Sequence, residues 1–161
     1  MADDSKPIVG IIMGSSSDAE TMEPARKILA EFGIPCEFKV ISAHRTPDLA
    51  FQYAQEAQDR GIRIIIAGAG GAAHLAGVIA AKTTLPVIGV PVKSKSLNGL
   101  DSLLSMVQMP SGIPVATVAI DGAANAGLLA ARIMGVTDKT INDKMKNYQA
   151  KLRDQVLQAK V

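Results

Sequence analysis

A short polar segment, Ser42 to Asp48, places one of the two histidines of the chain beside an arginine. Its letters are S-A-H-R-T-P-D. An imidazole can donate or accept a proton near neutral pH. A guanidinium holds a phosphate or carboxylate through a planar set of donors. His44 and Arg45, with the Ser42 hydroxyl as a further anion ligand, therefore predict proton transfer on an anionic small molecule.

A second candidate lies earlier in the chain, in the loop G-S-S-S-D from Gly14 to Asp18. Serine hydroxyls such as those of Ser15 and Ser17, together with N–H groups at a helix start, hold an anion well. Asp18 is suited to accept hydrogen bonds from sugar hydroxyls, as acidic residues do for ribose. Serine and aspartate are also favoured helix caps, so the loop is consistent with either binding or capping. Its spacing matches neither a Walker loop nor a dinucleotide fingerprint.

A third candidate is the glycine-rich loop Gly68-Ala69-Gly70-Gly71, which is followed by His74. Three glycines in four residues allow a ligand to approach the backbone closely. A turn with positive φ would explain the same glycines without any ligand. His74 is either a second polar group of the site or a surface histidine. His44 has no Cys, His or Glu at metal-ligand spacing, so we expect no metal.

Alternating apolar runs and helical patterns predict the elements that carry these loops. We expect strands over residues 8–13, 36–41, 63–67, 86–92 and 113–120, and helices from the serine loop to about 32 and over 47–60, 72–82, 99–107 and 123–134. This order predicts an α/β fold, a three-layer, doubly wound, flavodoxin-like parallel sheet with an extra C-terminal helix. Ligands bind such sheets at the carboxyl ends of the strands, where all three loops would lie. No linker divides residues 1–161, so we expect a single catalytic domain.

The last segment, about residues 138–159, predicts a helix with a single apolar stripe. The stripe consists of Ile141, Met145, Tyr148, Leu152 and Val156. Such a stripe packs either on its own domain or on another subunit, and the pattern alone does not decide between them.

Composition excludes several classes of protein. Acidic and basic residues are interspersed and give a net charge of +2, which is unlike a nucleic-acid-binding surface. The apolar runs are too short for a membrane span. The single cysteine, Cys36, fits a reducing compartment, and the acidic N-terminus lacks a signal-peptide pattern. We therefore expect a cytoplasmic protein.

Several stretches of this chain, in the same order, resemble the PurE family, the 5-(carboxyamino)imidazole ribonucleotide mutases of de novo purine biosynthesis. They are M-G-S-S-S-D at 13–18, S-A-H-R-T-P-D at 42–48, I-A-G-A-G-G-A-A-H-L at 66–75, G-V-P-V at 89–92, G-L-D-S-L-L-S at 99–105 and Q-M-P-S-G-I-P-V-A-T at 108–117. The similarity covers nearly the whole chain and is weakest in the C-terminal helix. His74-Leu75 and Gln108-Met109-Pro110 look like the mutase class rather than the related carboxylases.

The resemblance implies an isomerase that needs no cofactor. A carboxylate on the exocyclic nitrogen of the ribonucleotide moves to carbon 4 of the imidazole. The expected route releases CO2 into a closed pocket, where carbon 4 recaptures it. His44 would protonate the departing nitrogen and later take the proton from carbon 4.

The same resemblance implies the roles of the remaining site residues. Ser15, Asp18 and Arg45 would bind the ribose 5′-phosphate end of the substrate. Ser42 and the backbone of residues 68–71 would line the site, and His74 would sit on a loop that closes over it. Ser17, Ala69 and Leu75 complete the expected substrate-binding set. The family is a homo-octamer with sites at subunit boundaries, which favours packing of the C-terminal helix on a neighbouring subunit.

Two interpretations from other classes stay open. One is a purely structural oligomer, which makes the glycine-lined loop hard to explain. The other is a flavodoxin-like module that binds FMN or a nucleotide without catalysis. It suits the serine-rich loop, but it leaves His44 and Arg45 unused. The chain has no tryptophan and only two tyrosines, which gives little to stack on a flavin ring.

Overall fold

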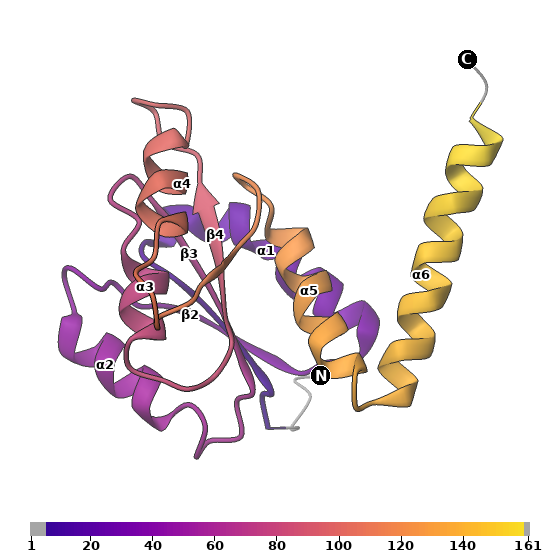
Figure 1. Cartoon of the computed structure of the whole chain (residues 1–161), viewed down its shortest axis with the longest axis horizontal. Coiled ribbons are helices and arrows are strands. Elements are labelled where there is room, and N and C mark those ends of the chain that lie inside the picture. Colours follow the sequence, from indigo (N-terminus) through magenta and orange to yellow (C-terminus); the bar gives the residue numbers. More distant parts are fainter. Residues whose placement is uncertain (1–5, 160–161) are drawn as a thin grey trace.

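The computed structural model describes residues 6–159 and has a five-stranded parallel sheet at its centre (Figure 1). Its strands are β1 (Val9–Met13), β2 (Cys36–Val40), β3 (Ile64–Gly70), β4 (Val87–Val92) and β5 (Ala116–Thr117). They lie in the order β2-β1-β3-β4-β5, and every pairing is parallel. Residues 1–5, which include the N-terminus expected to lack a signal peptide, lie outside the described part of the chain.

Helices cover both faces of the sheet. They are η1 (Ser16–Asp18), α1 (Ala19–Phe32), α2 (Pro47–Glu56), α3 (Leu75–Ala80), α4 (Leu100–Val107), α5 (Ala123–Gly135) and α6 (Lys139–Gln158). Helices α1 and α5 pack on one face, and α2, α3 and α4 pack on the other (Figure 1). The predicted three-layer, doubly wound fold with an extra C-terminal helix is confirmed.

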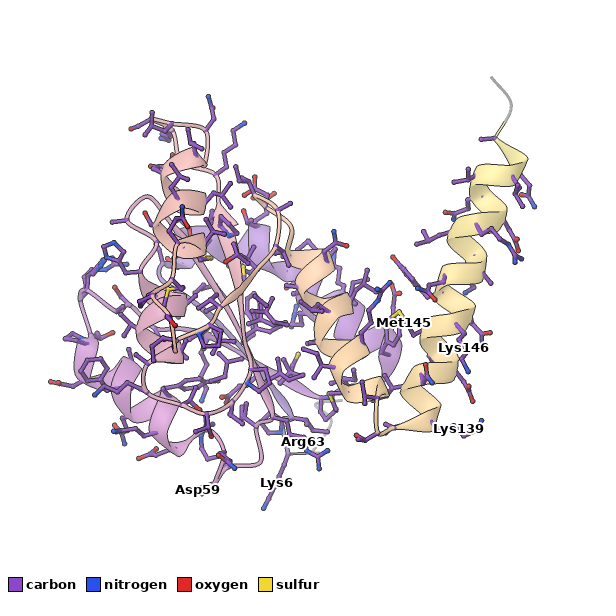
Figure 2. All side chains as sticks on the ribbon, viewed as in Figure 1. Lys6, Asp59, Arg63, Lys139, Met145 and Lys146 are labelled. Carbon is purple, nitrogen blue, oxygen red and sulfur yellow. The ribbon has the colours of Figure 1, made fainter. Side chains whose placement is uncertain are left out.

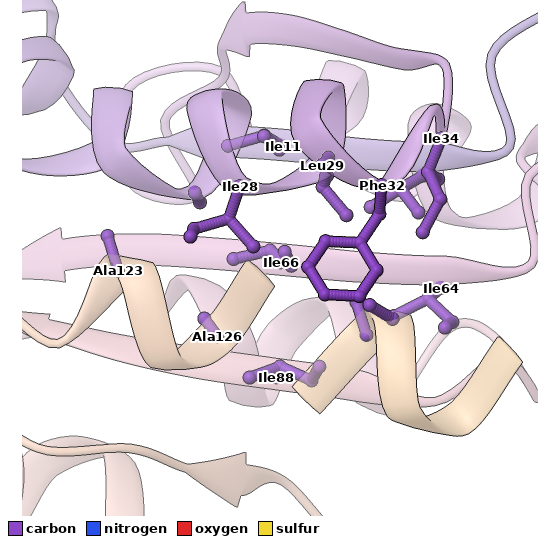
Figure 3. Close-up of a cluster of buried hydrophobic side chains, with 14 of the residues drawn as sticks. Ile11, Ile28, Leu29, Phe32, Ile34, Ile64, Ile66, Ile88, Ala123 and Ala126 are labelled. Atoms are coloured by element: carbon purple, nitrogen blue, oxygen red, sulfur yellow. The ribbon is translucent and has the colours of Figure 1, made fainter. Parts of the chain in front are cut away.

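The core consists mainly of aliphatic side chains, as the scarcity of aromatic residues requires. Strand β1 is buried along its whole length because helices cover both of its faces. Ile11 points toward α1 and α5, and Ile12 points toward α2 and α3. On the first of these faces, Phe32 of α1 packs over Ile64 and Ile66 of β3 (Figure 3).

Besides the fifth strand, three element boundaries differ from the prediction by three or more residues, and a glycine lies within or next to each segment that differs. Helix α2 ends at Glu56, because the following turn closes on Gly61 with a φ of 96°. Strand β3 continues through Gly68 to Gly70, so most of the expected glycine loop is strand. Helix α3 starts only at Leu75, because residues 71–74 form turns that begin at Gly71.

The fifth strand is much shorter than expected. The sequence predicts residues 113–120, but only Ala116 and Thr117 pair with β4. Pro114 has no N–H to donate, which explains why regular pairing starts after it. Beyond Thr117, Val118 still donates to the Gly89 carbonyl at 3.0 Å, so the chain follows β4 without regular strand geometry.

Helix α6 packs on its own chain over its first half only and projects away from the sheet (Figure 1). Ile141 and Met145 are buried, and Figure 2 shows Met145 on the side that faces α5. Tyr148 packs against Phe32, with ring centroids 6.0 Å apart. Leu152 and Val156 continue the same stripe but are 46% and 75% exposed. The predicted stripe is therefore divided between an intrachain half and an exposed half.

Candidate active site

Four loops meet at the carboxyl end of the sheet and enclose a cavity of about 420 Å³. The residues that line it are Gly14, Asp18, Ser42, Ala43, His44, Arg45, Ala69, Gly70, Gly71, Ala72, Leu75, Val92, Lys93 and Ser94. They follow β1, β2, β3 and β4, as expected for a ligand site in a parallel sheet. All three candidate loops of the sequence therefore contribute to one cavity.

Arg45 joins the loop after β2 to the loop after β1. Its Nη2 donates to the Gly14 carbonyl at 2.6 Å, and its Nε lies 3.3 Å from the Ser42 hydroxyl. Ser42 Oγ also accepts from the Arg45 backbone N–H at 3.1 Å. The turn ends at Pro47, the first residue of α2, whose fixed φ suits a helix start. The guanidinium is thus held in the lining of the cavity, and it keeps donor positions for an anion that no residue of the described chain takes up.

A smaller cavity of about 340 Å³ shares part of its lining with the first one. Gly14, Ser42 and Arg45 line both cavities, whereas Ser15 lines only the smaller one. The Ser15 hydroxyl accepts hydrogen bonds from the Ser17 N–H at 3.3 Å and the Ser17 hydroxyl at 2.9 Å. Ser15 therefore caps η1, as the capping interpretation predicts, and also lies beside Arg45, as the binding interpretation predicts.

Asp18 is a buried carboxylate in the wall of the cavity, with 8% of the residue exposed. Burial raises the pKa of Asp18 above its ordinary value. Hydrogen bonds from the Ser15 backbone and the Ser17 hydroxyl, with the charge of Arg45, offset this rise only in part. Ionisation of the Asp18 carboxyl therefore lowers the stability of the folded state, which is typical of a functional group.

Replacing Asp18 with asparagine is expected to stabilise the protein at neutral pH. A raised pKa means that the folded state binds this proton more readily than the unfolded chain does. The ionised carboxylate therefore lowers stability above the ordinary pKa and has no effect well below it. We therefore expect Asp18→Asn to have a higher Tm than the wild type at pH 7, and no such gain near pH 3.

Thermal unfolding of Asp18→Asn at both pH values, with Asp59→Asn as control, measures this effect. Asp59 is exposed and lies at the opposite end of the molecule (Figure 2). A Tm that falls equally at both pH values would contradict the interpretation.

The two histidines contact each other, but His44 lines the cavity and His74 does not. His44 Nε2 and His74 Nδ1 are 2.9 Å apart, and the rings meet edge to face with centroids 5.0 Å apart. One of these two nitrogens must donate the proton and the other must accept it. The contact therefore fixes one proton between the rings and orients the His44 imidazole.

The glycines of the third loop have different surroundings. Gly70 and Gly71 line the cavity, and Gly71 has a φ of 70°. A Cβ at Gly71 would meet nothing within 4 Å among the described residues, so the backbone is open to a ligand there. Gly68 lies beneath the site, where a Cβ would collide with Met22 Sδ. Gly68 thus makes room for the core rather than forming the wall of the cavity.

The remaining predicted residues are close by. Ala69 and Leu75 line the cavity, whereas Ser17 contacts it only through Ser15 and Asp18. Sequence reasoning missed Lys93 and Ser94, which follow β4 and also line the cavity. The sequence could have identified them, because they are polar residues directly after a buried strand.

The charges of the cavity suit an anionic ligand. Arg45 and Lys93 contribute two cationic side chains, and Asp18 contributes one carboxylate. Within residues 6–159, no group of three His, Cys, Asp or Glu side chains is arranged to hold a metal ion. The helices of this part of the chain include none with the length and apolar character needed to cross a membrane.

Comparison with known proteins gives a consistent result. The family model described as AIR carboxylase matches residues 8–155. An N5-carboxyaminoimidazole ribonucleotide mutase of Pyrococcus horikoshii is 64% identical over 151 residues, covering 94% of this chain and 85% of that protein. The Bacillus subtilis protein of the same name is 60% identical over 156 residues, covering 96% of each. The crystal structure of Treponema denticola PurE matches with a TM-score of 0.85 at 35% identity, covering 94% of each chain.

Proposed function

Since the chain belongs to the AIR carboxylase family, we propose that this cavity carries out the mutase reaction of purine biosynthesis. The enzyme converts 5-carboxyaminoimidazole ribonucleotide into 4-carboxy-5-aminoimidazole ribonucleotide. The observation that carries this proposal is the presence of His44 and Arg45 in one cavity with the Gly70-Gly71 backbone. A proton carrier, an anion ligand and an open backbone wall are the groups this reaction needs.

The substrate lies with its phosphate at Arg45. The guanidinium and the hydroxyls of Ser42 and Ser15 supply donors where the two cavities share their lining, and Ser17 supports Ser15 by donating to its hydroxyl. Asp18 accepts from the ribose hydroxyls, since its carboxylate lines the cavity close to Arg45. The imidazole ring then reaches the wall formed by Ala69, Gly70, Gly71 and Leu75, beside His44.

His44 carries the proton in both halves of the reaction. It donates a proton to the exocyclic nitrogen as the N–CO2 bond breaks, which gives aminoimidazole ribonucleotide and CO2. Carbon 4 of the ring then attacks CO2, and His44 takes the proton that carbon 4 loses. The two proton transfers cancel, so His44 ends the cycle as it began. The contact with His74 supports this role because it orients the imidazole.

The alternative of an FMN-binding module finds less support. The walls of the cavity are glycine, alanine, aliphatic and polar residues with one imidazole, rather than an aromatic stacking surface. A catalytic assay separates the two functions. The purified protein, given 5-carboxyaminoimidazole ribonucleotide, is expected to form the 4-carboxy isomer, whereas aminoimidazole ribonucleotide with bicarbonate should react far more slowly. Binding of the nucleotide without turnover would support the non-catalytic module.

We propose further that residues 1–161 form one catalytic domain that assembles as a homo-octamer, with α6 packing on a neighbouring subunit. The exposed half of the apolar stripe, Leu152 and Val156, supports this assembly because such surface is usually covered. His44, Arg45 and His74 are exposed in the single chain, so a neighbour at the site would help to keep CO2 from escaping. The free cysteine, Cys36, is consistent with a cytoplasmic location.

Replacing Val156 with glutamate is expected to dissociate the assembly. A buried carboxylate without a partner costs several kcal/mol, so each α6 contact would be lost. Gln155→Glu adds the same charge at the neighbouring exposed position and should leave the assembly intact. Sedimentation equilibrium gives the mass of each variant. A wild-type chain that sediments as a monomer, or a Val156→Glu variant of unchanged mass, would refute this assignment.

A further inference from the structure

We infer that Ser102 of α4 is a positioning residue for the active site, acting through Gly71 on the histidine pair. This inference rests on the proposed function. Ser102 belongs to the G-L-D-S-L-L-S stretch of residues 99–105, which has no part in the proton chemistry described above. Its hydroxyl connects two of the loops that line the cavity.

Ser102 is a fully buried polar residue, with 0% exposed. Its Oγ donates to the Val92 carbonyl at 2.6 Å and accepts from the Gly71 N–H at 2.9 Å. Gly70 and Val92 form the last pair in the register of β3 and β4. The Ser102 hydroxyl thus connects β3 and β4 one step beyond their last paired residues, where both segments line the cavity.

A second serine, one helical turn later, faces the same glycine. Ser105 Oγ lies 2.6 Å from the Asp101 carbonyl and 3.3 Å from the Gly71 carbonyl. A hydroxyl has one hydrogen, and the shorter contact is within the helix. Ser105 therefore supports Gly71 weakly, and Ser102 is the main connection.

Gly71 controls where His74 lies. It has a φ of 70°, and the turns that follow it run from the Ala73 N–H to the Gly71 carbonyl and from the His74 N–H to the Ala72 carbonyl, at 2.9 and 2.8 Å. His74 then meets His44 at 2.9 Å. A shift of Gly71 therefore moves His74 away from the His44 ring, although Ser102 itself does not line the cavity.

Replacing Ser102 with alanine tests this connection. We expect kcat to fall about 10- to 100-fold, the range expected when reacting groups are misplaced by up to about 1 Å, with a smaller rise in KM. Amide hydrogen exchange of the peptide covering residues 69–75 should become faster. Thr117→Val is the control, because it removes a hydroxyl that contacts the Met106 carbonyl at the other end of α4. It should leave kcat and this exchange unchanged.

A double-mutant cycle with His74→Asn distinguishes positioning from general loss of structure. If Ser102 acts through His74, adding Ser102→Ala to His74→Asn lowers kcat by less than about twofold. A further loss as large as in the wild-type background would overturn the inference. So would normal exchange at residues 69–75 with Ser102→Ala.

Two further outcomes, a variant that does not fold and a protein without mutase activity, can be distinguished from failure of this inference. If Ser102→Ala does not fold, Ser105→Ala is used instead, and we expect it to lower kcat by a smaller factor. This loss must also disappear when Ser105→Ala is added to His74→Asn. An undiminished loss of kcat in the His74→Asn background would overturn the inference. A wild-type protein without mutase activity would refute the proposed function. The exchange measurement would still show whether Ser102 holds Gly71.

Discussion

His44→Asn is expected to abolish mutase turnover while the protein remains folded. General acid–base catalysis by one side chain contributes roughly 10²- to 10⁴-fold, and His44 serves in both halves of this reaction. We therefore expect kcat to fall by at least about 10³-fold. Asparagine is similar in size and can hydrogen-bond to His74, but it cannot carry a proton.

Steady-state kinetics, with binding of the substrate measured separately, tests this expectation. Substrate affinity should change little, because the phosphate ligands are untouched. His74→Asn is the matched control: it breaks the same 2.9 Å contact but leaves the proposed proton carrier in place, so it should lose less activity. A His44→Asn variant that keeps more than a tenth of wild-type kcat would refute the proton-carrier role.

Arg45→Ala is expected to weaken substrate binding by about 2–3 kcal/mol, the value of a lost charge-assisted contact to a phosphate. This corresponds to a rise of roughly 30- to 150-fold in KM. The loss of kcat should be smaller than with His44→Asn, because Arg45 does not move the proton. Arg45→Lys keeps the charge but loses the planar donor pair, so an intermediate KM is expected.

Arg63→Ala provides the control for removal of one positive charge. Arg63 is exposed and precedes β3, at the end of the sheet away from the cavity (Figure 2). Its loss should leave KM unchanged. Since Arg45 also bonds to Gly14 and Ser42, unfolding by urea must be measured for each variant. A folded Arg45→Ala protein with wild-type KM would contradict the phosphate role.

The sequence predicted the fold well because its local signals agree with the tertiary structure. Ile11 and Ile12 are consecutive apolar residues in β1, and such a run is typical of a strand covered on both faces. Arg45 and Gly71 follow such strands, so their place at one edge of the sheet could be predicted without coordinates. The length of β5 could not, because pairing there depends on how Pro114 and the chain after Thr117 lie against β4.

The contacts within the site were less predictable. His44 and His74 are separated by 30 residues, and only the assembled loops show that their rings touch. Ser102 is a serine within an amphipathic helix, a position that is usually exposed, so its complete burial has no sequence signal. Likewise, the apolar stripe of α6 predicts packing but not that Met145 finds its partner within the chain while Val156 is exposed.

Transfer of a labelled carboxylate tests the central claim most directly. 5-Carboxyaminoimidazole ribonucleotide with ¹³C in the N-carboxylate is given to the enzyme in excess unlabelled bicarbonate. If the cavity holds the released CO2 until carbon 4 recaptures it, the 4-carboxy product keeps the label from the first turnover onward. Product that carries the unlabelled carbon of the solution would contradict the mutase account and indicate carboxylation from free CO2.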